Sequence, residues 1–276
     1  MNYPRYGQFG VLPPVIKYLM LINAAVFLVE ISLPAEVSNQ MVNFFALHYW
    51  GSELFRPHQL ITHLFMHGSW THLFMNMFTL WVFGSKLEVY WGPKRFLNFY
   101  LICGIGAALC HLGVLTYENV ELSKHISEFM NEPGSDAFMK IYRDYDLNSG
   151  SFAVTQLVNA VMDYPNDPTV MENAKIFLQH FQEEYRNMAT LGASGAVYGI
   201  LFAFGYLFPN TYFYLFLLPF QIKAKYIVGT MIIMEILAGF RNVAGDNVAH
   251  FAHLGGVLFS YILLKTWNRN NRKDFY

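Results

Sequence analysis

The sequence predicts an all-α, polytopic membrane protein in which a bundle of six transmembrane helices carries one helical insert outside the membrane. The first observation is composition: of 276 residues, 54% are hydrophobic and only 13% are charged, whereas a soluble domain carries about 25% charged residues. The second observation is a set of six apolar runs. The third is a single long polar interruption between the third run and the fourth.

The apolar runs have the lengths expected of membrane helices. A span needs about 20 mostly apolar residues, and fewer where the protein thins the membrane or buries the start of a helix. Arg5 precedes the first run and no small-residue cleavage site follows it, so we expect a retained anchor rather than a removed signal peptide. The expected spans are 14–34, 70–90, 97–116, 191–208, 226–240 and 248–266.

Lysine and arginine residues predict the orientation of the bundle. If the six spans alternate in direction, most basic residues near their ends fall on one side, and the opposite short loops carry only Arg56 and Arg241. By the positive-inside rule, both termini are then cytoplasmic. The formal net charge of −1 at pH 7 gives no reason to expect nucleic acid as a partner.

Residues 118–189 form the polar interruption, which this orientation places outside the cytoplasm. They hold 12 of the chain's 19 acidic residues but only 5 of its 18 lysines and arginines. Apolar residues at helical spacing predict helices at 121–130, at 151–164 and after Asp167 and Pro168, which would cap and begin the last of them. The apolar stripe of that last helix would be Val170, Ala174, Phe177, Phe181 and Tyr185.

The insert divides the chain into three parts. Residues 1–117 hold the first three spans, 118–189 are the acidic helical insert, and 190–276 hold the last three spans and a basic cytoplasmic tail. Two roles stay open for the insert. It is either a small helical cap on the outer face or a module that recognises or gates substrates and partners.

The stretch LGASGAVYGI (191–200) places one serine among small residues at the start of the fourth span. Gly195 and Gly199 have the four-residue spacing of close helix contacts, so Ser194 can be a packing residue. It can also be a nucleophile, because the first turn of a helix presents unsatisfied N–H groups and the positive end of the dipole. Such donors suit a developing oxyanion, and Gly192 would let a substrate backbone approach. This stretch alone leaves both interpretations open.

Two histidines lie at the start of the sixth span, in NVAHFAHLGGVLFSY (247–261). A serine nucleophile needs a base, and imidazole suits that task near neutral pH. Gly256 follows His253 by one turn and leaves a flat face that can pack on the fourth span, which would bring His253 to Ser194. His250 lies about 300° around the helix from His253, so we expect it to be a surface or loop residue.

A third polar set occupies residues 58–78, around the start of the second span. His72 and Asn76 are four apart on one helix face and can donate to an oxyanion, although polar contacts between helices are the alternative. His63 and His67 have the spacing of a metal pair. However, no Asp, Glu or Cys nearby completes a tetrahedral site, and the motif HExxH is absent. We therefore expect no metal and no cofactor, and a metal channel is the weakest alternative.

No acidic residue is an obvious third member of a catalytic triad. Glu88 belongs near the cytoplasmic end of the second span, far from the outer mouth where Ser194 would lie, and Glu235 is the other main acid within the later spans. A Ser–His pair without an acid is a recognised variant of the triad. We therefore predict a dyad of Ser194 and His253.

The motifs HLFMN (72–76), GASG (192–195) and AHLGG (252–256), in this order on alternate spans, resemble the rhomboid family of intramembrane serine proteases. The resemblance covers most of the chain apart from 118–189. It implies a bacterial-type six-helix rhomboid-like core in a bacterial inner membrane, with Ser194 as nucleophile and His253 as general base.

The resemblance also implies roles for neighbouring residues. It makes His72, Asn76 and the Ser194 N–H the oxyanion contacts, and it makes Tyr198 pack against the imidazole. It implies that Glu88 is structural. The small residues that would support this site are Gly192, Gly195 and Gly256.

Three features depart from the family's pattern. His58-Gln59 stands where many members have Trp-Arg, Ser260 stands where a second glycine is common, and the insert is far longer than the usual loop. The fifth span and FRNVAGDN (240–247) are the expected moving parts. The resemblance implies that the substrates are membrane proteins with a transmembrane segment, cleaved within the bilayer near small residues. The alternative is an inactive relative that retains or escorts membrane proteins.

Overall fold

The computed structural model of the 276-residue chain describes residues 12–145, 147, 151–214, 221–241 and 250–271. Helices joined by loops make up most of these residues. The named strands among them are one short antiparallel pair, β1 (Tyr212–Tyr214) and β2 (Gln221–Lys223). The prediction of an all-α fold is therefore confirmed for the described chain, with this small hairpin as an addition.

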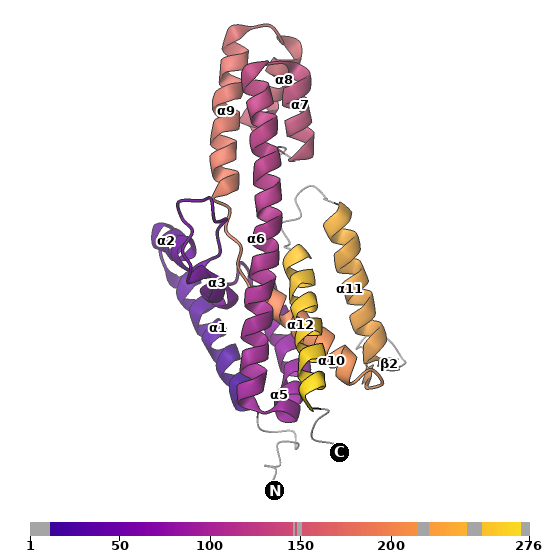
Figure 1. Cartoon of the computed structure of the whole chain (residues 1–276). Helices are drawn as coiled ribbons and strands as arrows, with labels where there is room; N and C mark the ends of the chain where they lie inside the picture. The colour runs from indigo at the N-terminus through magenta and orange to yellow at the C-terminus, as the bar shows by residue number, and fades with distance from the viewer. Residues whose placement is uncertain (1–11, 146, 148–150, 215–220, 242–249, 272–276) are drawn as a thin grey trace, which may run out of the picture.

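The body of the molecule is a bundle around α10 (Ser194–Leu207). Helix α6 (Pro93–Asn131) and helix α12 (His250–Asn271) pack on α10, and α11 (Ala224–Arg241) lies against both α10 and α12. On the other side are α1 (Pro14–Ser32) and α4 (Trp70–Thr79), which continues through a π-helical turn, Leu80–Gly84, into α5 (Ser85–Trp91). In the view of Figure 1, the start of α1 and the end of α12 lie at the same end of the molecule.

Two of the described helices, α1 and α6, are long and apolar enough to cross a membrane, and α10 is apolar but only 14 residues long. Large apolar side chains are nevertheless exposed over α1, α4 and α11, where a soluble protein would expose few together. Examples are Leu21 and Leu28 on α1, Phe74 and Phe78 on α4, and Ile233, Met234 and Leu237 on α11. The complete set of six spans stays a prediction.

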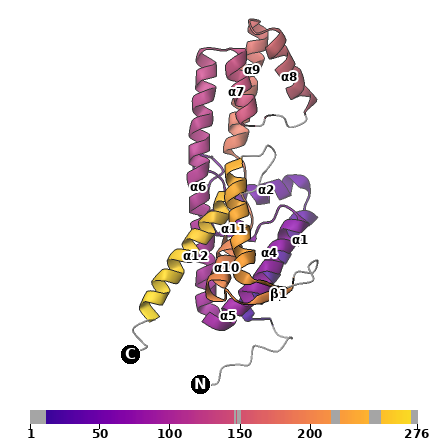
Figure 2. The ribbon, with the colours of Figure 1, turned by 90° about the vertical axis from the view of Figure 1, so that its right-hand side faces the viewer.

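The insert is a second helical cluster at one end of the molecule, and it grows out of the third predicted span. Helix α6 runs without a break to Asn131 and is followed by α7 (Ser135–Asp144), α8 (Phe152–Asp163) and α9 (Pro168–Arg186). Figures 1 and 2 show α7 and α9 beside the far half of α6, with α8 lying against α9 and α7. The cluster has its own buried core, which includes Leu122, Ile126, Phe129, Phe138, Ile141, Val161, Ala174 and Leu178.

The expected helix boundaries of the insert are partly right. Asp167 caps α9, because its carboxylate accepts the Thr169 and Val170 N–H groups at 2.7 and 3.1 Å. The separate helix expected at 121–130 is wrong: no helix breaker precedes Pro133, so this segment simply prolongs α6. Helix α7 was not predicted. The division of the chain at residue 117 falls inside α6, and three separate domains stay a prediction.

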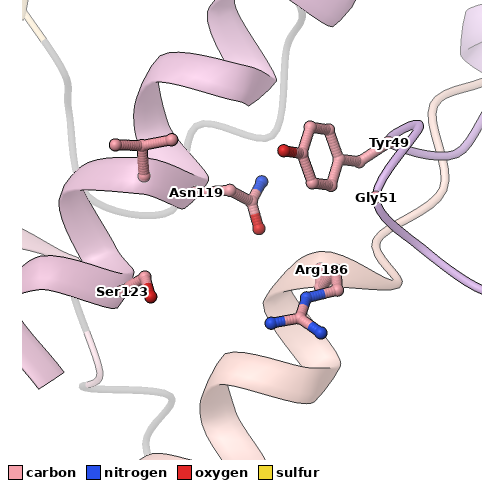
Figure 3. Close-up of a pocket in the computed structure, with 6 residues that line it drawn as sticks. Tyr49, Gly51, Asn119, Ser123 and Arg186 are labelled. Atoms are coloured by element: carbon pink, nitrogen blue, oxygen red, sulfur yellow. The ribbon is translucent and has the colours of Figure 1, made fainter. Parts of the chain in front are cut away.

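At the base of the insert, the last turn of α9 is hydrogen-bonded to α6. Tyr185 on α9 donates to the Glu118 carboxylate on α6 at 3.2 Å, and burial raises the pKa of Glu118. Beside this contact is a pocket with polar side chains from α6, from α9 and from the loop after α2 (Ala35–Phe45), as Figure 3 shows. The residues that line it are Tyr49, Gly51, Asn119, Val120, Ser123 and Arg186.

Three residues or segments singled out by the sequence are Glu88, Gln59 and the loop 240–247. Glu88 accepts the Val15 and Ile16 N–H groups at the start of α1, both at 2.9 Å, which agrees with a structural role. Gln59, at one of the departures from the family's pattern, is fully buried and bonds to backbone atoms of Asn43, Leu54 and Arg56 in the segment between α1 and α4. The expected moving loop 240–247 lies, after Arg241, outside the described residues.

Candidate active site

Ser194 begins α10, and the chain before it is held in place by the segment between α1 and α4. Leu47 and Thr190 exchange backbone hydrogen bonds of 2.8 Å, and the Gly192 N–H donates to the His63 carbonyl at 2.9 Å. Gly192 has a φ of +127°, a conformation that favours glycine. The turn at Gly192 therefore sets where the serine enters the helix. The first N–H groups of α10 have no partner within the helix.

Glycines allow α10 and α12 to touch backbone to backbone. A Cβ atom added at Gly256 would lie 1.8 Å from the Gly195 carbonyl oxygen, and one added at Gly199 would lie 3.0 Å from the Gly256 carbonyl oxygen. The Ser260 hydroxyl also donates to the Gly199 carbonyl at 2.8 Å. The close helix crossing expected of Gly195 and Gly199 is thus present. It is compatible with Ser194 being a nucleophile.

The crossing brings a histidine to the serine. His253 Nε2 lies 2.8 Å from Ser194 Oγ, which is hydrogen-bond distance for a nucleophile and its base. Tyr198, one turn after the serine, stacks on the His253 ring with centroids 4.3 Å apart and planes at 11°. His253 is only 7% exposed. The geometry expected of these three residues is found, and their catalytic roles stay predictions.

His72 and Asn76 both lie on α4 toward this site, but with different neighbours. A Cβ added at Gly192 would lie 2.7 Å from His72 Nε2 and 3.7 Å from Ser194 Oγ, so the His72 ring is close to the serine. Asn76 is buried, and its Nδ2 is 3.1 Å from His67 Nε2. An oxyanion role for either side chain stays a prediction.

The histidine pair His63 and His67 forms no metal site among the described residues. His63 Nδ1 is 2.7 Å from the Gln59 carbonyl, so one of its ring nitrogens is engaged by backbone. The group of three possible metal ligands found in the described chain lies elsewhere and consists of Glu235, His250 and His253.

Two expectations about this second group are wrong. Glu235 of α11 reaches the site: its Oε2 is 2.9 Å from His253 Nδ1, so an acid does lie behind the proposed base. His250 is not a simple surface or loop residue, because it begins α12 and its Nδ1 is 2.6 Å from the same oxygen. A separation of about 300° around α12 does not keep the two histidines apart, because one carboxylate on the neighbouring helix α11 can contact both rings.

One signal in the sequence could have identified Glu235. An ionisable side chain inside an apolar membrane helix is costly, and it is therefore a functional candidate by default. The segment IIMEILAG (232–239) contains such a residue. What the sequence does not give is the rotation of α11 about its axis, which decides whether the carboxylate faces lipid, the loops or His253.

Comparison with known proteins identifies one family. The rhomboid domain model matches residues 52–123 and 154–269. Rhomboid-like protein 11, chloroplastic, of Arabidopsis thaliana is 24% identical over 184 residues, which are 67% of this chain and 55% of that protein. RHOMBOID-like protein 12, mitochondrial, of the same plant is 30% identical over 121 residues, 43% of this chain and 34% of that protein. The chain thus spans about half the length, or less, of these curated relatives.

Proposed function

Because the chain belongs to the rhomboid family of membrane-embedded proteins, we propose that it is an intramembrane serine endopeptidase. The single observation that carries the proposal is the 2.8 Å contact between Ser194 Oγ and His253 Nε2 in a buried site. Loss of either residue would be expected of an inactive escort protein, and this chain retains both. The substrates proposed are membrane proteins with a transmembrane segment, in a bacterial inner membrane.

The proposed reaction is acyl transfer to Ser194. His253 takes the hydroxyl proton as Ser194 attacks the scissile carbonyl, and it then returns a proton to the leaving amine. The oxyanion is stabilised by the Ser194 N–H at the start of α10, with His72 and Asn76 as further donors. Water then hydrolyses the acyl-enzyme. A substrate helix must unwind locally, because helical carbonyls are already hydrogen-bonded and shielded.

A serine-directed fluorophosphonate tests this proposal directly. The folded wild-type protein is expected to be labelled, and labelling should disappear in Ser194→Ala, because only an activated serine reacts. Ser260→Ala is a matched control, since Ser260 is another buried serine of the bundle but donates to the Gly199 carbonyl. Unlabelled wild type, or undiminished labelling of Ser194→Ala, would rule out the proposed function.

We extend the proposal to the insert, which would contact substrates or partners and limit access to Ser194. The motivation is that the insert directly precedes the chain that positions Ser194. Val120 and Arg186 line one pocket, so the segment between them can be replaced by a short linker without stretching the body. Deleting 121–185 in this way should change relative cleavage rates among several transmembrane substrates. If the cleavage rates of all these substrates stay unchanged, the insert is only a helical cap and does not limit access to Ser194.

A further inference from the structure

We propose that Glu235 positions the general base, so that this chain uses a Ser194–His253–Glu235 triad rather than the predicted dyad. The inference rests on the proposed function and deepens it by adding a residue that acts through His253. In chain order the serine precedes the acid and the acid precedes the histidine. The three side chains come from the three consecutive helices α10, α11 and α12.

The three side chains are connected by two hydrogen-bond contacts through the His253 ring. His253 Nε2 is 2.8 Å from Ser194 Oγ, and His253 Nδ1 is 2.9 Å from Glu235 Oε2. The two ring nitrogens of one imidazole are therefore engaged on opposite sides, by a nucleophile and by a carboxylate. This is the arrangement in which an acid fixes the orientation and tautomer of a catalytic histidine.

The carboxylate decides which nitrogen carries the proton. An ionised carboxylate only accepts hydrogen bonds, so the Nδ1 atom facing Glu235 must be the N–H donor. The lone pair of neutral His253 is then on Nε2, where it can accept the Ser194 proton. When that proton arrives, His253 becomes an imidazolium beside a negative charge. Glu235 stays ionised throughout, and no proton passes to it.

Glu235 is itself held by further donors. The Tyr198 hydroxyl donates to Oε1, and His250 Nδ1 is 2.6 Å from Oε2. Glu235 is 8% exposed, and a buried carboxylate is tolerated only when hydrogen bonds replace its hydration. Tyr198 thus has two contacts with the site, because its ring stacks on His253 and its hydroxyl bonds to the acid. The position of the acid is set by α10 and α12 together.

The Glu235 oxygen lies closer to the two histidine nitrogens than donor atoms lie to one another around a zinc ion. A zinc ion bound at about 2.0 Å by tetrahedral ligands holds the donor atoms about 3.3 Å apart. The two nitrogen–oxygen distances here are 2.6 and 2.9 Å, which are hydrogen-bond distances. A purely structural role in helix packing would leave unexplained why the acid meets the imidazole edge opposite Ser194.

The test compares Glu235→Gln and Glu235→Asp with wild type, as full-length proteins in lipid bilayers with a single-pass reporter substrate. Glu235→Gln should lower kcat by between about 100-fold and 10⁴-fold with little change in KM, since an amide can also donate and so no longer specifies the tautomer. Glu235→Asp keeps the charge and should recover much of the lost kcat. The low-field Nδ1 proton resonance of His253 should be present in wild type and absent in Glu235→Gln.

Glu88→Gln is the matched control, because Glu88 is the other buried glutamate of the body and holds the start of α1. It should lower the unfolding temperature and change kcat by less than about threefold. Normal kcat in Glu235→Gln, no recovery in Glu235→Asp, or no low-field proton in wild type would overturn the inference. Failure of wild type itself to cleave or to be labelled would instead contradict the proposed function.

Discussion

A His253→Ala variant is expected to lose at least about 10⁴-fold in kcat/KM for cleavage of a transmembrane reporter. Alanine removes the only atom that lies at hydrogen-bond distance from Ser194 Oγ in the described chain, so nothing remains to take the hydroxyl proton. A neutral serine hydroxyl is a weak nucleophile without a base. The measurement is steady-state cleavage in proteoliposomes, with unfolding temperature recorded for each variant.

The double variant Ser194→Ala/His253→Ala sharpens this prediction. Residues that act as a unit are not additive, so the double variant should be no slower than either single one. His180→Ala is the control, because His180 is exposed on α9 of the insert. A His253→Ala protein within about tenfold of wild type would show that another group is the base.

The sequence predicted the most apolar helices of the body, such as α1, α6 and α10, because their signals are local. Asp167 followed by Pro168 likewise marks the start of α9 without any tertiary information. The continuation of α6 through the insert was missed because a change from apolar to amphipathic composition looks like a boundary. The helix nevertheless continues through that change in composition, and it ends at Asn131, just before Pro133 and Gly134.

The two sides of the site differ in how far the sequence could predict them. Ser194 and His253 lie beside small residues whose spacing predicts a close crossing of α10 and α12. Their contact therefore follows from a local sequence pattern on each helix. Glu235 has no such pattern on its own helix, where a Cβ added at Gly229 would meet no atom within 4 Å. Its direction depends on how α11 is rotated, and that is a property of the assembled bundle. The hairpin β1–β2 likewise forms by pairing that neither short strand indicates alone.

Gly256→Ala is the second variant for which we expect a large effect. The added Cβ would lie 1.8 Å from the Gly195 carbonyl oxygen, and a backbone atom cannot turn aside as a flexible side chain can. Helix α12 must therefore move away from α10, and His253 moves with it. A displacement of about 1 Å in a catalytic site can cost about 100-fold in rate. Overpacking of this kind also destabilises a protein by about 1–3 kcal/mol.

Gly113→Ala separates the effect of this contact from the general effect of adding a methyl group to a helical glycine. Gly113 lies in α6, and a Cβ added there would meet no atom within 4 Å. Alanine is favoured over glycine in a helix by about 1 kcal/mol, so Gly113→Ala should be at least as stable as wild type and equally active. If Gly256→Ala matched Gly113→Ala in both cleavage and unfolding temperature, close approach of α10 and α12 would not be what holds His253 at Ser194.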